Sequence, residues 1–379
     1  MNISNRLENE KNIFFLEGKI DHESAPLLEK NLNQAVLNGD SICLDFEKIT
    51  YISSLGLRVL FSISKQLGND KKLMIKNVSK DIINIFTITG FNEFIDIESL
   101  PIEISLENSE LIGKGVSGEC YKLSDETILK LYFDNIPADL PEKEKANAKA
   151  AFVAGIPTPI SFELAVSGKR KGIIYEKLDA VTLSYLIVKD PENVSRYVNI
   201  FTELCKLIHN THGNTEVFSL MKINCIDSIK AADFLSDIQK ERIITRIMKE
   251  IPDSSTCIHG DLHTSNILMD QDIPFLIDMS DFSIGYYMFD IGQIYNLYYN
   301  SLVTGISEKA LGMNPQLAYK VWLLFEEMYF HCKNESDRKR IREEASFYGC
   351  LRMFMFYHAQ GKNENMKKWI LQHFIPLFD

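Results

Sequence analysis

The chain has 379 residues, of which 45% are hydrophobic and 25% charged, and its 41 basic and 52 acidic side chains give a net charge of −11. This composition excludes a mainly disordered chain, and the length predicts two or three domains. The acidic balance argues against nucleic acid and against an anionic membrane as partners, because both attract basic surfaces.

The first twelve residues are polar, and no stretch offers about 18 successive apolar residues. The sequence therefore predicts neither a signal peptide nor a membrane-spanning helix. The seven cysteines are scattered without a CxxC pair, which predicts reduced thiols and no zinc site. We expect a cytoplasmic protein.

Short apolar runs alternate with helical patterns over residues 1–100. The expected elements are strands at 13–18, 41–46, 72–75 and about 94–97, and helices at 25–37, 57–67 and 81–89. Strands that alternate with helices predict a sheet covered by helices, so we expect a small α/β domain here.

The pattern restarts after Leu100-Pro101. The next expected elements are strands at 111–113, 127–132 and 172–176 and a helix at 146–154. Helical patterns dominate from Val194 onward, apart from a loop-rich segment at 257–289. We expect a second domain, of α+β class, over residues 105–379.

A glycine-rich segment opens this second part, with Gly113, Gly115 and Gly118 in the spacing GxGxxG. Glycines let a backbone approach phosphate oxygens and direct N–H groups at them. A plain turn between two strands is the alternative interpretation. No helix follows and the GK[ST] ending is missing, so neither a dinucleotide-binding fold nor a P-loop is expected.

Lys130 lies 12 residues beyond Gly118, between apolar residues of an expected strand. A lysine that points inward needs a counter-charge, and we favour Glu144 over Glu142. A glycine loop, a strand lysine and a helix glutamate, in this order, hold the ATP phosphates in protein kinases.

The strongest signal is the run His259–Leu268, which is followed by an apolar strand that ends at Asp278. The Asp261 carboxylate can accept the proton of a substrate hydroxyl. Asn266, five residues on, can turn its amide oxygen to a metal, and Asp278 can bridge Mg²⁺ to phosphates. The alternative is that these groups only cap turns.

Residues from about 105 to 379 resemble the aminoglycoside phosphotransferase and choline kinase family, a branch of the protein-kinase-like fold. The resemblance rests on HGDLHTSN at 259–266, which is similar to the family's HGDLHxxN catalytic loop. It implies a bilobal fold, with an N-lobe at about 105–180 and a C-lobe at about 181–379. It also implies an enzyme that transfers phosphate from ATP, with Mg²⁺, to an alcohol group.

The resemblance further implies a role for each matching residue. These are Asp261 as catalytic base, Asn266 and Asp278 as metal ligands, His259 and Asp290 as supports of the catalytic loop, and Gly113, Gly115, Gly118, Lys130, Glu144, Glu176 and Leu178 as the ATP site. Asp281 either faces the acceptor or is a surface turn residue. The family's Gly after the metal-binding Asp is Met279 here, which removes no ligand.

Residues from about 10 to 100 resemble the STAS family of anti-sigma-factor antagonists. The matching segments are Gly18–Asp21, Leu44–Phe46 and Tyr51–Arg58. The resemblance implies a STAS-binding regulatory protein as a partner.

In that family a helix N-terminus carries a phosphorylatable Ser or Thr, and by alignment the candidate here is Ser54, with Ser53 beside it. Ile52 stands where the family has Asp. From the residues alone, Ser53 or Ser54 caps the helix that begins near Leu55. Capping and phosphorylation are compatible, because the helix dipole favours a phosphate at this end.

Three hypotheses stay open for the acceptor: a small molecule such as an aminoglycoside, amino sugar or amino alcohol; Ser53 or Ser54 of this or another STAS protein; or none, in a nucleotide-sensing regulator. Glu326-Glu327 and Glu343-Glu344 are expected on solvated helix faces, with an acidic acceptor pocket as the alternative.

Overall fold

The structure is a computed structural model that describes residues 1–8, 11–38, 41–67, 73–89, 91, 95–107, 109–359 and 364–378. Internal contacts divide the chain into two compact units, Met1–Asn108 with Glu163–Ile174, and Ser109–Phe162 with Tyr175–Asp379. The seven cysteines all lie in the described part of the chain, and none of them forms a disulfide bond. Among the described helices, none combines the length and the apolar character needed to cross a bilayer.

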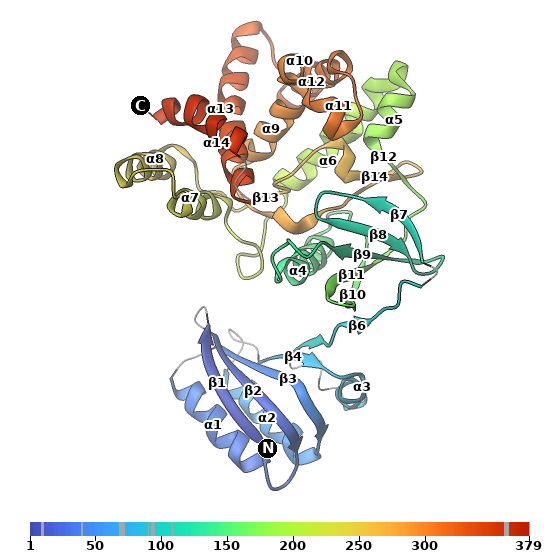
Figure 1. The fold of residues 1–379 in the computed structure, drawn as a ribbon, viewed down its shortest axis with the longest axis vertical. Coiled ribbons are helices and arrows are strands. Elements are labelled where there is room, and N and C mark those ends of the chain that lie inside the picture. Colours follow the sequence, from blue (N-terminus) through green and yellow to red (C-terminus); the bar gives the residue numbers. More distant parts are fainter. Residues whose placement is uncertain are drawn as a thin grey trace. The chain divides into compact units, whose positions relative to one another are not determined.

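The N-terminal unit contains a five-stranded sheet in the order β1-β2-β3-β4-β5 (Figure 1). Its strands are β1 (Asn2–Glu8), β2 (Lys11–Ile20), β3 (Ser41–Ile52), β4 (Met74–Val78) and β5 (Asp96–Ser99). β1 and β2 are antiparallel, and the other neighbours are parallel. Each parallel pair needs a crossover, which α1 (Ala25–Leu37), α2 (Ser54–Leu67) and α3 (Lys80–Ile88) provide.

One apolar core joins this sheet to its helices. Its buried side chains include Phe14, Leu16, Leu44 and Phe46 from the strands and Leu28, Leu60 and Phe86 from the three helices. Because all three helices contribute to the same core, they cover the same face of the sheet. The α/β expectation for this part of the chain is therefore correct.

The sequence analysis predicts no strand before residue 13, but β1 lies there. An edge strand that is half exposed needs few apolar residues, and in β1 Ile3 packs against the core while Leu7 is exposed. Lys72 and Phe94, where two strands are expected to begin, lie outside the described residues.

Helix α2 begins at Ser54, and the preceding residue caps it. The Ser53 Oγ accepts a hydrogen bond of 3.3 Å from the Gly56 N–H, which otherwise has no partner in the first turn. Ser54 is exposed as the first helical residue. Gly56 is required by packing, because a Cβ here would lie 2.6 Å from Ile20 Cγ2.

A second sheet has the strand order β6-β10-β11-β9-β8-β7. Its strands are β6 (Ile102–Glu103), β7 (Glu110–Lys114), β8 (Gly118–Lys122), β9 (Thr127–Tyr132), β10 (Ser161–Ser167) and β11 (Arg170–Glu176). β7, β8 and β9 form an antiparallel meander. Helix α4 (Leu140–Val153) follows β9 and begins six residues earlier than the sequence suggests.

The rest of the chain is mainly helical, and short strands lie within the loop-rich segment at 257–289. The helices are α5 (Leu183–Lys189), η2 (Pro191–Asn193), α6 (Val194–Asn210), α7 (Met221–Ala231), α8 (Asp237–Glu250), η3 (Thr264–Asn266), η4 (Met279–Asp281), α9 (Met288–Ile294), η5 (Tyr295–Tyr299), α10 (Ser301–Thr304), α11 (Ile306–Leu311), α12 (Pro315–Phe330), α13 (Glu335–Ala359), α14 (Glu364–Trp369), η6 (Ile370–Phe374) and η7 (Ile375–Phe378). The strands are β12 (Val181–Thr182), β13 (Cys257–Ile258), β14 (Ile267–Asp270), β15 (Ile273–Leu276) and β16 (Ser283–Ile284).

Two glycines let α9 and α13 approach closely. A Cβ on Gly292 would lie 2.4 Å from the Gly349 backbone nitrogen, and a Cβ on Gly349 would lie 2.9 Å from the Gly292 carbonyl oxygen. The Asn296 amide also donates to the Gly349 carbonyl at 2.9 Å. Backbone therefore meets backbone at this crossing, and any larger residue separates the helices.

The expectation that Glu326 lies on a solvated face is wrong. This residue of α12 has no exposed surface, and its carboxylate accepts from Arg338 and Arg342 at 2.8 Å. Two guanidinium groups compensate its burial, so the carboxylate belongs to the packing of α12 and α13.

We predict that Gly292→Ala lowers the free energy of unfolding of the C-terminal unit by about 1–3 kcal/mol, the usual range for an overpacked interior. Both tryptophans, Trp322 and Trp369, lie in this unit, so their fluorescence during urea unfolding reports it. The matched control is Gly115→Ala, whose Cβ meets nothing closer than 3.9 Å. Equal stability of the two variants would contradict the close helix contact.

Candidate active site

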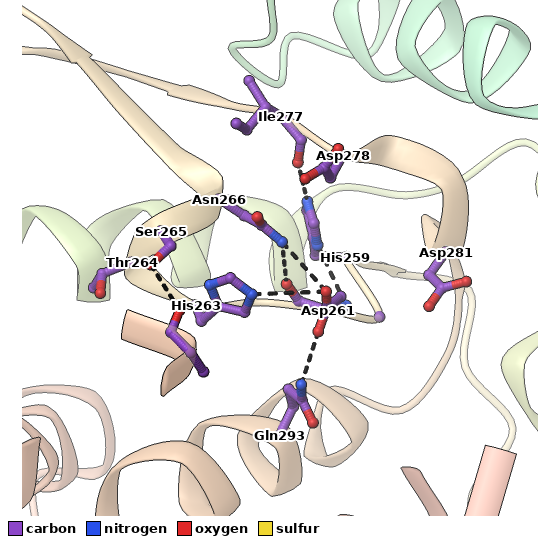
Figure 2. Close-up of polar contacts among 12 residues, drawn as sticks. His259, Asp261, His263, Thr264, Ser265, Asn266, Ile277, Asp278, Asp281 and Gln293 are labelled. Carbon is purple, nitrogen blue, oxygen red and sulfur yellow. Dashed lines mark hydrogen bonds and ion pairs between the residues drawn. The ribbon is translucent and has the colours of Figure 1, made fainter. Parts of the chain in front are cut away.

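The segment 259–266 forms a loop between β13 and β14, and the residues after β15 return to it. β13 pairs with β16 and β14 with β15, so both ends of the loop are anchored in strands. The Ile277 N–H donates to the Asn266 carbonyl oxygen at 3.0 Å. These pairings place Asp261, Asn266 and Asp278 close together (Figure 2).

A buried carboxylate from α9 holds the start of this loop. Asp290 has no exposed surface, and it accepts from the His259 N–H at 2.8 Å and from the Gly260 N–H at 2.7 Å. Its Oδ2 also lies 3.1 Å from His209 Nε2. Burial raises the pKa of Asp290, but the contacts with His209 and His259 together outweigh it and hold the pKa below the ordinary value.

His259 connects the loop to the end of β15. Its Nε2 lies 3.0 Å from the Ile277 carbonyl oxygen, and its Nδ1 lies 3.3 Å from the Asp261 N–H. These partners fit a neutral ring that donates through Nε2 and accepts through Nδ1. The ring thereby ties the backbone before Asp278 to the backbone of Asp261.

The Asp261 carboxylate is oriented from two sides. Its Oδ1 accepts a 2.7 Å hydrogen bond from Gln293 Nε2 of α9, and its Oδ2 lies 3.4 Å from Asn266 Nδ2 and 3.6 Å from His263 Nε2. About a third of the side chain is exposed. Burial raises the pKa of Asp261, but the contact with His263 and the charges of His263, Arg352 and His259 together lower it by more, so the net shift is downward and the group is ionised at neutral pH.

Asn266 and Asp278 present oxygen atoms at the same side of the loop. Asn266 Nδ2 donates to the Asp261 carbonyl oxygen at 2.9 Å, which turns its Oδ1 the other way, and no described group donates to that oxygen. Asp278 has a left-handed backbone (φ 60°), and one of its carboxylate oxygens contacts Lys130 Nζ.

These two residues fit a magnesium ion. Mg²⁺ in nucleotide sites is bound by oxygen atoms from one or two side chains and otherwise by phosphate and water. One amide oxygen and one carboxylate meet that requirement. Among the described residues there is no cluster of three or more His, Cys, Asp and Glu that would form an all-protein metal cage.

Lys130 is buried in β9 and pairs with Glu144 of α4, at 2.7 Å from Oε1. The ion pair is thus made with Glu144 rather than Glu142. Burial lowers the pKa of Lys130, but Asp278 and Glu144 raise it well above the ordinary value, so the ammonium group stays charged.

Two tyrosine hydroxyls complete the surroundings of Glu144, which is almost fully buried. Tyr132 donates to Oε2 at 2.6 Å, and Tyr175 donates to Oε1 at 3.1 Å. Burial and the nearby carboxylate raise the pKa of both phenols, so they remain donors. Glu144 therefore has three donors and a fixed orientation.

The three glycines of the β7–β8 turn are not equivalent. A Cβ on Gly118 would lie 2.4 Å from the Leu131 carbonyl oxygen, so the neighbouring strand requires glycine. Gly113 and Gly115 have nothing within 3.6 Å of a Cβ. The Gly115 N–H donates to the Gly118 carbonyl at 2.9 Å and closes the turn.

Glu176 ends β11 and Leu178 follows in the segment before β12. The Glu176 backbone N–H donates to the Ile160 carbonyl at 2.9 Å, and its Oε2 accepts from the Ile160 N–H at 3.2 Å. These two hydrogen bonds with Ile160 fix the end of β11. Ser53 and Ser54 belong to the N-terminal unit and are not part of this cluster.

Asp281 lies in the short helix η4 and packs against the loop. A Cβ on Gly260 would lie 2.6 Å from the Asp281 carbonyl oxygen, so this glycine permits the contact. The Asn147 amide of α4 donates to the carbonyls of Met279, at 2.9 Å, and Phe282, at 3.2 Å. Asp281 Oδ2 accepts from Arg352 of α13 at 3.0 Å.

Several residues of the site are absent from the sequence analysis. Gln293 follows Asp290 by three residues and therefore lies on the same helix face, and Tyr132 follows Lys130 by two and lies on the same strand face. These two spacings could have identified Gln293 and Tyr132 from the sequence. Nothing local marks Tyr175 or Arg352, because each acts on a residue far away in the sequence.

Family models match both parts of the chain. The model described as "Phosphotransferase enzyme family" matches residues 110–312, which is more than half of the chain, and the STAS domain model matches residues 5–107. The anti-sigma-B factor antagonist of Bacillus subtilis (strain 168) is 33% identical over 87 residues, which are 22% of this chain and 78% of the relative.

Solved structures are similar to the C-terminal part. A choline/ethanolamine kinase family protein from Mesorhizobium loti has 13% identity and a TM-score of 0.43, over 69% of this chain and 87% of that chain. An aminoglycoside-3'-phosphotransferase of type VIII has 14% identity and a TM-score of 0.44, over 65% and 93%. The match of the family model over more than half of the sequence shows that the chain belongs to the phosphotransferase enzyme family and carries a STAS domain before its phosphotransferase domain.

Proposed function

We propose that the C-terminal unit transfers the γ-phosphoryl group of ATP, in the presence of Mg²⁺, to a hydroxyl group of a small molecule of the aminoglycoside or amino alcohol kind. The observation that carries this proposal is the meeting of Asp261, Asn266, Asp278 and Lys130 at one place in the fold. Phosphoryl transfer needs positioning and charge stabilisation more than covalent chemistry, and this set provides both.

On the nucleotide side, Gly113 and Gly115 leave room for phosphate oxygens close to the turn, and Gly118 holds the turn against β9. Lys130, kept charged and fixed by Glu144, orients the phosphates. The backbone at Glu176 and Leu178 receives the adenine ring.

Asn266 Oδ1 and the Asp278 carboxylate would hold Mg²⁺. When bound, the ion neutralises charge on the phosphate oxygens. Lys130 contacts Asp278 in the structure, so the ammonium group shares or releases that contact when its phosphate ligand enters.

On the acceptor side, Asp261 accepts a hydrogen bond from the attacking hydroxyl and takes up its proton as the new P–O bond forms. Gln293 donates to the other carboxylate oxygen and so keeps Asp261 aimed. Asp290 and His259 fix the backbone from which Asp261 projects.

A second acceptor class is favoured by one observation in the N-terminal unit. The Ser54 hydroxyl is exposed in the first turn of α2, where the helix dipole stabilises a phosphate. The curated relative is named an anti-sigma-B factor antagonist, which suggests a regulatory partner for this unit. A protein kinase or a nucleotide-sensing regulator acting on STAS serines is the alternative function.

We predict that Asp261→Asn lowers kcat by about 10²–10⁴-fold, the usual contribution of a positioned general base. The dissociation constant for Mg-ATP stays within about twofold, because Asp261 faces the acceptor. Labelled ATP with a panel of aminoglycosides, amino alcohols and sugars measures the first quantity, and calorimetry measures the second.

The matched control is Asp272→Asn, which removes a carboxylate from an exposed ion pair with Arg196. It should keep the wild-type rate. Transfer that persists at full rate in Asp261→Asn would refute the assigned base.

We predict that Gln293→Leu lowers kcat about tenfold and leaves KM for ATP unchanged, because a hydrogen bond to a charged group contributes about 1.5–3 kcal/mol. Gln293→Glu should lower kcat further than Gln293→Leu does, because it places a second carboxylate beside Asp261. Steady-state kinetics on both variants checks this order, and a Gln293→Leu enzyme with unchanged kcat would remove Gln293 from the site.

Intact-mass and peptide mass spectrometry of the same reactions test the alternative acceptor. If the small-molecule proposal is right, label appears in a panel compound and the protein mass stays unchanged. Label on Ser53 or Ser54 that disappears in Asp261→Asn would instead make the STAS serines the acceptor.

A further inference from the structure

One ion pair beside the catalytic loop is unusual for its position. Arg352 comes from the middle of α13, and only 6% of its side chain is exposed, whereas 47% of the Asp281 side chain is exposed. The pair therefore has a buried positive end and an accessible negative end. In the view of Figure 2, Asp281 lies on the opposite side of Asp261 from Asn266.

The backbone around Asp281 is held on two sides. Its carbonyl packs on Gly260, the residue before Asp261, and the Asn147 amide binds the carbonyls on either side of the η4 turn. A surface turn that only connects two strands needs no such support. The arrangement fixes a carboxylate at a set position next to Asp261.

The guanidinium group of Arg352 is incompletely paired. Nη2 donates to Asp281 Oδ2 at 3.0 Å, but the buried Nε has no hydrogen-bond partner among the described residues. Burial lowers the pKa of Arg352, but Asp281 and Asp261 raise it above the ordinary value, which places both carboxylates near the same cation. A buried, partly unsatisfied charge is expensive, so stability alone does not explain it.

The carboxylate of Asp281 is left with one unused oxygen. Oδ2 is bound by Arg352, and no described group donates to Oδ1. A half-exposed, fixed acceptor atom beside the catalytic base suits a hydrogen-bond donor on the substrate. Because Arg352 cancels the charge of Asp281, the pair attracts a cation only weakly, and a neutral hydroxyl is the better match.

Resting on the function proposed above, we propose that Asp281 and Arg352 form an acceptor subsite that binds a second hydroxyl group of the substrate, next to the hydroxyl that Asp261 receives. Asp281 Oδ1 accepts the hydrogen bond, and Arg352 is a positioning residue that holds Asp281 and neutralises it. Among the compounds proposed above, the substrate class is thus a polyhydroxylated one, such as an aminoglycoside, another sugar or a cyclitol.

The test uses the full chain with labelled ATP and Mg²⁺. The acceptors are myo-inositol and glucose as neutral polyols, streptomycin as a cationic polyol, and choline as an alcohol with a single hydroxyl. The variants are Asp281→Asn, Arg352→Met, Arg352→Lys and the double variant Asp281→Asn/Arg352→Met, with Asp272→Asn as the control for loss of a paired carboxylate elsewhere.

We expect the polyols, neutral or cationic, to be better acceptors than choline. Asp281→Asn and Arg352→Met should each raise KM for them by at least tenfold, with kcat changed by less than threefold. The effects should not add in the double variant, because both remove one subsite. Arg352→Lys should raise KM for the polyols less than Arg352→Met does. KM for choline should not change in any of these variants.

Asp281→Asn leaves a buried guanidinium unpaired and is the variant at risk of misfolding. Tryptophan fluorescence during urea unfolding checks this, and the double variant, which removes both charges, gives the same KM information in a stable background. An unchanged polyol KM in the folded double variant would overturn the subsite, as would equal loss of kcat with every acceptor.

The outcomes also separate this inference from the function on which it rests. Turnover of choline with none of the polyols refutes the polyol subsite and keeps the phosphotransferase. No transfer to any panel compound, with Mg-ATP still bound, refutes both the small-molecule function and the subsite.

Discussion

The candidate active site depends on one buried carboxylate that touches no expected ligand. Asp290 receives the backbone N–H groups of His259 and Gly260 and a ring nitrogen of His209. A carboxylate without exposed surface is tolerated only while such donors surround it, so the folded state keeps all three in place. Because two of the donors immediately precede Asp261, Asp290 fixes the backbone from which this carboxylate, the proposed base, projects.

The same turn of α9 serves two further purposes. Gln293, one turn after Asp290, reaches the Asp261 carboxylate, while Gly292, on another face of the helix, admits α13 at backbone distance. That close approach is what brings Arg352, three residues after Gly349, to Asp281. The nucleotide side is built separately, from Lys130 and its hydrogen-bonded partner Glu144. Acceptor geometry and nucleotide geometry thus rest on different contacts within one unit.

How much of the fold and of the candidate site could be predicted depends on how far apart in the sequence the contacting residues lie. The loop 259–266 and Asp278 form one short stretch, so local pattern was sufficient there. Alternating strands and helices predicted the N-terminal sheet except for its edge strand β1. Gln293 carried a usable helix spacing. Glu326 looked like a solvated residue because it is one of two adjacent acidic residues in a helical stretch. Only the return of α13 supplies its partners Arg338 and Arg342. No local sequence pattern predicts the contact of Arg352 either, because its partner Asp281 lies 71 positions away.

The glycine motif shows a different limit of sequence patterns. GxGxxG treats its three glycines alike, but the structure separates them by what a side chain would meet. At Gly118 a Cβ would collide with the backbone of β9, so the fold alone requires glycine there. At Gly113 and Gly115 the fold imposes no such demand, because a Cβ there would make only ordinary van der Waals contacts, at 3.7 and 3.9 Å. The function proposed above accounts for glycine at those two positions, because a phosphate group would come close to the turn beside the charged Lys130 on the adjoining β9.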